Sequence, residues 1–263
     1  MATIVEMEQF RRANARIAEM ARRDLKSFVG SLDLTRPELA RDALIEFVPI
    51  LTREYGDIAA STAVEWFDEL RAAEDVPGVF RAVASHAVPD AQAAASVRWS
   101  AQHLFTDAPS EVLKPLEGAV VNMVLAPSRA TIIEMTRRDP RGQGWHRNAR
   151  PTACDFCIML AGRGGIYRSE KSASFAAHDG RCYCTASPSW DASAPEVPSR
   201  AYEASQRMQK VRNRAADSSN PKEQARAKRV LETHRARTRT WLEESKSDLD
   251  AYRSDLAREL KSA

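Results

Sequence analysis

Four cysteines, the only ones in the chain, lie within 31 residues of one another and are the residues best suited to chemistry. Cys154 and Cys157 form a C-x-x-C pair, and Cys182 and Cys184 form a C-x-C pair. A C-x-x-C turn sets two sulfur atoms about one tetrahedral edge apart, and a second pair of thiolates further along the chain completes a zinc site. Four protein ligands leave no coordination position for a water molecule, so the pattern predicts a structural Zn²⁺ site rather than a catalytic one.

The ligand set has a fifth candidate, because His178 lies shortly before the second cysteine pair. Four thiolates, or three thiolates and one imidazole, are both sound ligand sets for zinc, so the fourth position stays open between His178 and Cys184. Two alternatives compete with zinc, namely two disulfides in an oxidising environment or buried thiols without a metal. A redox-active C-x-x-C is disfavoured because no βαβ pattern precedes it.

An enzymatic function would require a nucleophile and a base. His178 with Cys182 or Cys184 is the available Cys–His pair, but a thiolate that already binds zinc is a weak nucleophile. The sequence contains no G-x-S-x-G, H-E-x-x-H or deaminase-type zinc motif. The other histidines are expected to be surface or structural residues: His86, His103, His146 and His234. These observations favour a protein that is not an enzyme.

The elements that must position these residues are mostly helical. The 263-residue chain has only 10 glycines, is rich in Ala, Glu and Arg, and contains 43% hydrophobic and 29% charged residues. This composition is typical of a folded, mainly α protein and excludes a disordered chain. No apolar run approaches the roughly 18 residues that a membrane span requires. The charged N-terminus does not resemble a signal peptide, so we expect no membrane association.

We divide the chain into three parts: a helical domain over 1–138, a small zinc-knuckle-like α+β module over 139–199, and a basic helical C-terminal arm over 200–263. The middle part holds all four cysteines, six of the ten glycines and five of the thirteen prolines. Short β-compatible stretches occur in it around residues 145–150, 165–168 and 182–187.

Apolar residues at steps of three and four predict the helices of the first part. The expected ranges are 5–32, 35–55, 57–70, 90–105 and 110–138. Thr35 and Glu38 have the spacing of a capping box at the start of the second helix. Gly56 is expected to break the chain between the second and third helices, and Pro115 and Pro127 to interrupt the last one.

The arm is predicted to contain a helix that Asn220 caps and that begins at Pro221. An apolar stripe over 242–260 predicts either a docking or coiled-coil helix or packing on the chain's own bundle. Between residues 207 and 239, eleven basic residues stand against three acidic ones, a local net charge of about +8. Such a run either contacts DNA phosphates without sequence preference or is a solvated helix face. The basic residues are Arg207, Lys210, Arg212, Arg214, Lys222, Arg226, Lys228, Arg229, Arg235, Arg237 and Arg239.

Four motifs follow one another in the middle part: Trp145-His-Arg147, Cys154-Asp-Phe-Cys157-Ile-Met-Leu-Ala, Arg163-Gly-Gly-Ile-Tyr167 and His178-Asp-Gly-Arg-Cys182-Tyr-Cys184. In this order they resemble the C-terminal signature of the MuF-like minor head proteins of tailed bacteriophages. Residues 40–70, with Tyr55-Gly-Asp57 and Trp66-Phe-Asp-Glu-Leu70, are similar to the actinobacteriophage branch of that group.

The resemblance implies a structural head-morphogenesis protein that is present in the host cytoplasm during assembly and is packaged inside the virion head. It implies the portal protein and a capsid or scaffold protein as partners, with packaged DNA as a further one. Members of this branch are labelled minor capsid protein or capsid maturation protease, so proteolysis during prohead assembly is the first alternative function. The second alternative is a non-specific DNA-binding module.

Overall fold

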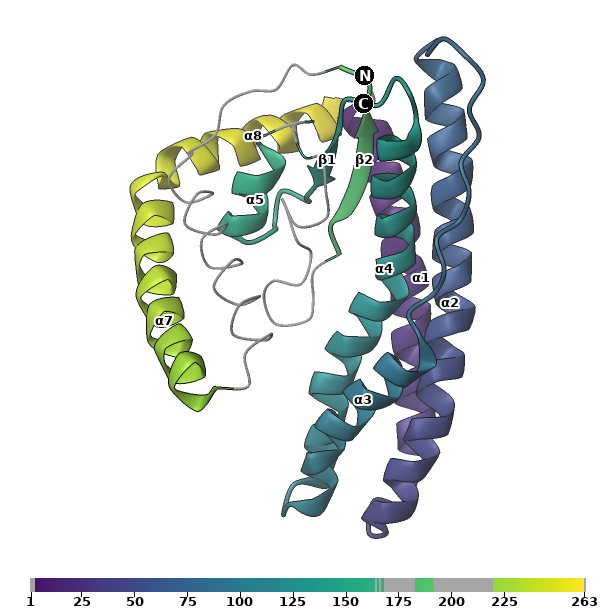
Figure 1. Cartoon of the computed structure of the whole chain (residues 1–263), viewed down its shortest axis with the longest axis vertical. Helices are drawn as coiled ribbons and strands as arrows, with labels where there is room; N and C mark the ends of the chain where they lie inside the picture. The colour runs from purple at the N-terminus through teal and green to yellow at the C-terminus, as the bar shows by residue number, and fades with distance from the viewer. Residues whose placement is uncertain (1–2, 164, 166, 168–182, 192–219, 263) are drawn as a thin grey trace.

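The computed structural model describes residues 3–163, 165, 167, 183–191 and 220–262. Within these residues the protein is mainly α-helical with one two-stranded sheet, as the composition predicts (Figure 1). The helices are α1 (Ile4–Gly30), α2 (Pro37–Ala73), α3 (Asp90–Ser100), α4 (Leu113–Arg138), α5 (Asp155–Ala161), α7 (Pro221–Glu244) and α8 (Lys246–Ser262). Two short 3₁₀ helices, Ala101–Phe105 and Pro109–Val112, join α3 to α4. No helix in the described ranges is long and apolar enough to cross a membrane.

Three long helices, α1, α2 and α4, lie side by side and form the body of the molecule (Figure 1). The central element is α4, which packs against α1, α2 and both strands. Its apolar side chains are buried along its whole length, from Leu116 through Val124 to Ile132. A helix with this much buried surface must be surrounded by other elements, so α4 organises the fold.

Helix α2 runs without interruption from Pro37 to Ala73, so the predicted break at Gly56 is wrong. Gly56 is buried where α2 meets α4, and a Cβ atom at this position would lie 3.2 Å from Cγ of Pro127. The glycine therefore serves close helix packing rather than a turn. The predicted capping box is also wrong, because the N-cap of α2 is Arg36 and makes no side-chain cap. Thr35 instead donates its backbone N–H and its hydroxyl to the carboxylate of Asp33.

The two prolines of α4 do not interrupt it, contrary to prediction. Pro115 lies in the first turn, where the N–H that proline lacks would have no helical partner. Pro127 lies inside the helix and is buried. An interior proline costs a helix about 3 kcal/mol, and the tertiary contacts of this face outweigh that cost. The carbonyl of Pro127 accepts a hydrogen bond of 2.8 Å from the hydroxyl of Thr131, one turn later.

The sheet consists of β1 (Gly144–Asn148) and β2 (Thr185–Ser189), which pair antiparallel. Tyr167 adds an isolated bridge to Trp145, and the two rings pack with their centroids 5.0 Å apart. The predicted β-compatible stretches around 145 and 165 therefore meet in space. The third predicted stretch begins later than expected, because pairing starts at Thr185.

One hydrophobic cluster joins the three predicted parts of the chain. It contains Phe67 and Ile132 from the helical bundle, Trp145 and Ile158 from the cysteine-rich part, and Leu249 from the arm. Helix α8 packs against α1 and α5, so the part of the predicted apolar stripe from Leu249 onward is covered by its own chain. Leu242 belongs instead to α7, because the helix breaks at Ser245. The cysteine-rich part thus shares one hydrophobic core with the helical bundle and the arm.

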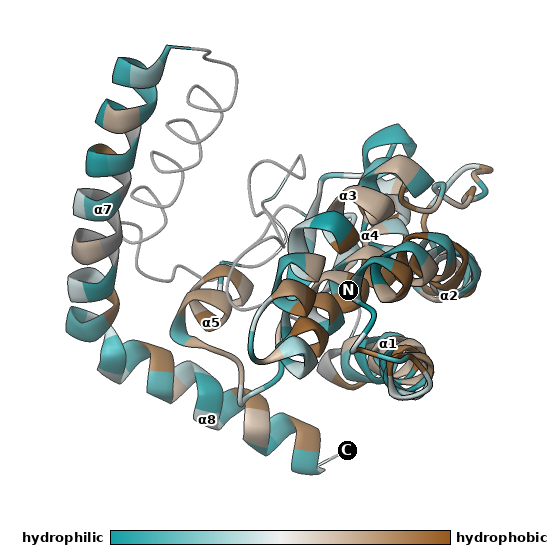
Figure 2. Ribbon diagram, turned by 90° about the horizontal axis from the view of Figure 1, so that it is seen from below, coloured by the Kyte–Doolittle hydropathy of each residue, from teal (hydrophilic) through white to brown (hydrophobic). Residues whose placement is uncertain are grey.

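Helix α7 begins as predicted, with Pro221 as its first residue and Asn220 as its N-cap. The side chain of Asn220 accepts a hydrogen bond of 3.0 Å from the backbone N–H of Lys222. The helix is largely hydrophilic around its circumference and lies apart from the three-helix body, to which α8 connects it (Figure 2). Its polar character is typical of a solvent-exposed helix.

Candidate metal centre

Three of the five predicted zinc ligands belong to the described part of the chain: Cys154, Cys157 and Cys184. His178 and Cys182 lie outside the described residues, so the complete ligand set stays a prediction. Among the residues that the structure describes, no three His, Cys, Asp or Glu side chains are close enough together to hold a metal ion. The surroundings of the three cysteines nevertheless show what kind of site this region can form.

The C-x-x-C segment is a turn that leads into α5. Cys154 is the N-cap residue of this helix, and its carbonyl accepts a hydrogen bond of 3.0 Å from the N–H of Ile158. Cys157 lies in the first helical turn and is 4% exposed, whereas Cys154 is exposed. The turn therefore directs one cysteine into the core and leaves the other at the surface.

A buried arginine lies beside the inner cysteine. Arg147 of β1 is 2% exposed, and its Nη2 atom lies 3.7 Å from Sγ of Cys157. A positive charge next to sulfur stabilises the thiolate relative to the thiol, and the thiolate is the form that binds a metal. In the sequence, Arg147 stands out only as part of a motif, and nothing local indicates this chemical role.

Cys184 is buried immediately before β2, at the end of the sheet where Thr185 pairs with Asn148. Its carbonyl accepts a hydrogen bond of 2.9 Å from Nε of Arg129, a buried residue of α4. The strand register also pairs Arg147 with Ala186, two residues after Cys184. Cys184 is thus held by the central helix at the same end of the sheet as the arginine that contacts Cys157.

The C-terminal helix closes over the C-x-x-C turn. Arg253 of α8 donates to the carbonyls of Pro151 and Ala153, at 3.3 and 2.8 Å, and its Nη2 atom lies 2.6 Å from the carboxylate of Asp155. Lys246 lies 3.1 Å from the same carboxylate. Burial alone would raise the pKa of Asp155, but the hydrogen bonds from Arg253 and Lys246 outweigh burial and lower it. Nothing in the sequence predicted this contact, although the apolar stripe predicted either a docking or coiled-coil helix or packing on the chain's own bundle.

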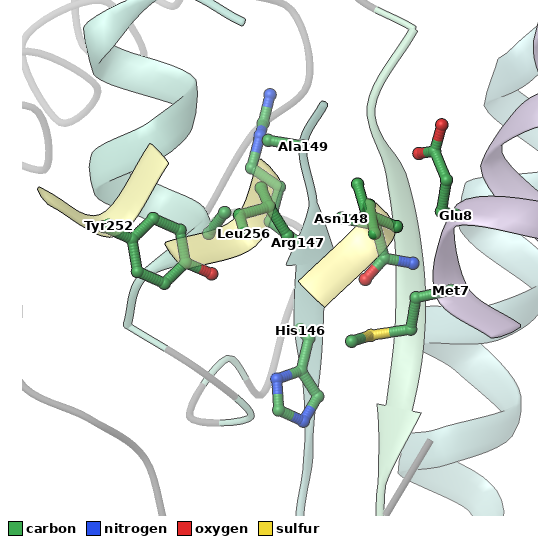
Figure 3. Close-up of a pocket in the computed structure, with 10 residues that line it drawn as sticks. Met7, Glu8, His146, Arg147, Asn148, Ala149, Tyr252 and Leu256 are labelled. Carbon is green, nitrogen blue, oxygen red and sulfur yellow. The ribbon is translucent and has the colours of Figure 1, made fainter. Parts of the chain in front are cut away.

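A pocket lies where α8, β1 and the start of α1 meet (Figure 3). Its lining includes His146 from β1, Met7 from α1, and Tyr252 and Leu256 from α8. Burial lowers the pKa of His146 to about 4, so the imidazole is neutral at physiological pH. Its Nε2 atom points at Gly165, where an added Cβ would lie 2.8 Å away. His146 is thus a largely buried side chain of β1 that lines this pocket and packs against Gly165.

The predicted DNA-contacting residues divide into two groups. The first four, Arg207, Lys210, Arg212 and Arg214, lie outside the described residues, and the other seven lie on α7. Five of the seven have exposed side chains: Lys222, Arg226, Lys228, Arg229 and Arg239. Arg235 and Arg237 belong to the same helix. The structure thus presents a basic helix at the surface.

Comparison with known protein families identifies the family to which the chain belongs. The model of the family described as VG15 protein matches residues 1–208. The chain belongs to the VG15 family. This is a viral or phage protein family, which supports the phage origin that the motifs implied. The match contains the helical body and the cysteine-rich part, whereas α7 and α8 lie beyond it. No curated protein and no solved structure matches the chain.

Proposed function

We propose that this VG15 family member is a minor head protein that binds the portal or the inner capsid and is packaged in the virion, with structural zinc in its middle part. Cys154, Cys157, Cys182 and either Cys184 or His178 would hold the ion. The observation that carries the proposal is that a member of this family packs its cysteine-rich part into a core shared with the helical bundle and the arm, where Cys157 and Cys184 are buried. Such a site suits a structural ion better than an open catalytic cleft.

The residues present fit zinc by their chemistry. Thiolates are soft ligands, and a buried guanidinium beside Cys157 compensates part of the negative charge of a thiolate site. Bound zinc would tie the turn before α5 to the segment before β2, which are far apart in the sequence. Metal binding would then contribute to the folding free energy of the whole middle part.

The metal content of the full-length protein tests the zinc proposal. We expect about one zinc per chain by elemental mass spectrometry, lost in Cys154→Ser and in Cys157→Ser. Thr152→Ala, an exposed residue of the same turn, is the matched control and should retain the metal. Retention in His178→Ala would assign the fourth position to Cys184. A wild-type protein without metal and with four titratable thiols contradicts the zinc proposal.

The head assignment is tested by association with the phage's own assembly proteins. Co-expression with the portal protein should yield a complex that survives size-exclusion chromatography, and the protein should be present in purified virions. Absence from virions together with no binding to portal, capsid or scaffold protein would refute the proposal. If the C154S variant is less stable but still binds the portal protein, then zinc serves folding rather than recognition.

The same purified proteins also test the two alternative functions, proteolysis and DNA binding. A capsid maturation protease would cleave capsid or scaffold protein, and Cys182→Ala or His178→Ala would abolish that cleavage while wild-type chain is active. A DNA-binding module is favoured by the exposed basic side chains of α7 and would retain DNA with a steep salt dependence. The cleavage assay and the DNA-retention assay are both run on the wild-type protein, in parallel with the portal-binding measurement.

A further inference from the structure

The C-x-x-C turn obtains part of its hydrogen bonding from a distant helix. Within the turn, the N–H of Ala153 donates to the carbonyl of Arg150, and the carbonyl of Cys154 is bonded into α5. The carbonyls of Pro151 and Ala153 instead accept from the guanidinium of Arg253, about a hundred residues later in the chain. Because backbone carbonyls near a core require partners, this guanidinium helps to define the conformation of the turn.

The position of Arg253 on α8 makes this contact a rigid one. Leu249 and Leu256, one turn before and one turn after it, are the buried residues of the helix. Residues at these spacings share one helix face, so Arg253 emerges from the face that is packed on the core. Its planar guanidinium also contacts the carboxylate of Asp155, and several donors in one fork restrain direction as well as distance.

We infer that Arg253 is a positioning residue for the metal-binding turn and that it couples metal binding to docking of the C-terminal arm. The inference rests on the zinc site proposed above. A metal site requires its ligands within a few tenths of an ångström of the binding geometry, and Arg253 holds the backbone on both sides of Thr152, directly before Cys154. By linkage, a metal that fixes the turn strengthens the docking of α8, and docked α8 strengthens metal binding.

The test compares zinc affinity, measured by competition with a chromophoric chelator, in the full-length wild type, Arg253→Ala, Arg253→Lys and Arg258→Ala. Loss of an outer-shell partner typically weakens a metal site about 10- to 100-fold, which is the expected effect of Arg253→Ala. Lysine keeps the positive charge beside Asp155 but lacks the several fixed donors of the guanidinium, so the zinc affinity of Arg253→Lys should be intermediate. Arg258 lies on the same helix with an exposed side chain that pairs with Asp255, three residues earlier, so its substitution should leave the affinity unchanged.

Melting temperatures with and without zinc separate positioning from general stabilisation. Coupling predicts that Arg253→Ala reduces the zinc-induced rise in melting temperature, whereas a merely structural contact would lower both melting temperatures equally. Equal zinc affinity in wild type and Arg253→Ala overturns the inference and leaves the proposed zinc site intact. If Arg253→Ala does not fold, a wild-type affinity in Arg253→Lys overturns it instead. A wild-type chain that binds no zinc overturns both.

Discussion

Arg71 of α2 and Asp139, which follows the last residue of α4, form a buried ion pair with Nε and Oδ2 2.8 Å apart. The same guanidinium donates to the carbonyls of residues 76, 77 and 78, and the indole of Trp190 donates to Oδ2 of Asp139. Burial would raise the pKa of Asp139, but the hydrogen bonds that its carboxylate accepts from Arg71, from the backbone N–H of Arg141 and from Trp190 outweigh burial and lower it. The pair therefore joins the ends of two bundle helices to the segment after β2.

Removal of one partner of this pair should destabilise the protein strongly. Asp139→Ala leaves the guanidinium of Arg71 buried without its carboxylate, and such a change typically costs about 3–5 kcal/mol of unfolding free energy. Asp255→Ala, which removes the exposed ion pair with Arg258, should cost about 0–1 kcal/mol. Urea unfolding followed by circular dichroism measures both. Equal midpoints for the two variants would contradict this role of the Arg71–Asp139 pair.

His146 should make stability depend on pH in the mildly acidic range. Its pKa falls from the ordinary value of 6.5 to about 4 in the folded protein, so between these values the unfolded chain binds a proton that the folded chain does not. Stability is therefore undiminished above pH 6.5 and is lost as pH falls toward 4. The total loss is about 3 kcal/mol, because one pKa unit corresponds to about 1.4 kcal/mol.

Chemical denaturation at a series of pH values tests this dependence. His146→Gln should flatten the stability curve between pH 6.5 and 4, whatever its effect on stability at neutral pH. His103→Gln, which removes a histidine from the 3₁₀ helix after α3, is the control variant. The carboxylate of Asp139, whose pKa is lowered from 3.8, loses its contribution toward the acid end of this range and below it, and does so equally in wild type and variant. An unchanged slope in His146→Gln would argue against a buried neutral imidazole.

Gly165 should not tolerate a side chain. A Cβ atom there would lie 2.5 Å from Oγ of Ser189 and 2.8 Å from Nε2 of His146. Overpacking of this kind typically costs about 1–3 kcal/mol, so Gly165→Ala should lower the unfolding free energy by that amount. Gly30→Ala is the control, because nothing lies within 4 Å of its added Cβ. Thermal unfolding of the two variants provides the comparison.

The basic helix should contribute a salt-sensitive part of any DNA affinity. Replacement of Lys222, Arg226 and Arg229 by Gln should reduce the slope of log K against log salt by up to about 0.9 for each phosphate contact that is lost. A matched triple substitution at Arg16, Arg23 and Lys26 on α1 removes the same charge from another exposed surface. The salt slopes of the two triple variants are measured by fluorescence anisotropy with a labelled duplex at several salt concentrations. Equal slopes for both triple variants would indicate that α7 is merely solvated.

Local patterns predicted much of the fold. Apolar spacing placed α1, α3 and α8 because residues that recur on one helix face must be buried whichever element covers them. The cap of α7 at Asn220 also followed from local chemistry, since a side-chain oxygen before Pro221 satisfies an N–H that the helix itself cannot. Glycine and proline were the failures, because Gly56 and Pro127 occur inside helices whose packing outweighs their local tendency to break a helix.

The sequence by itself determined that this is a mainly helical protein with a cysteine-rich middle part and a basic arm, since composition and spacing are local properties of the chain. Only the tertiary structure decided that Arg147 lies beside Cys157 and that Arg253 holds the turn before Cys154. Arginine has no local signature for such contacts. Which carbonyl or sulfur a guanidinium meets depends on strand register and on the face with which a distant helix packs, and both are set by burial of the common core.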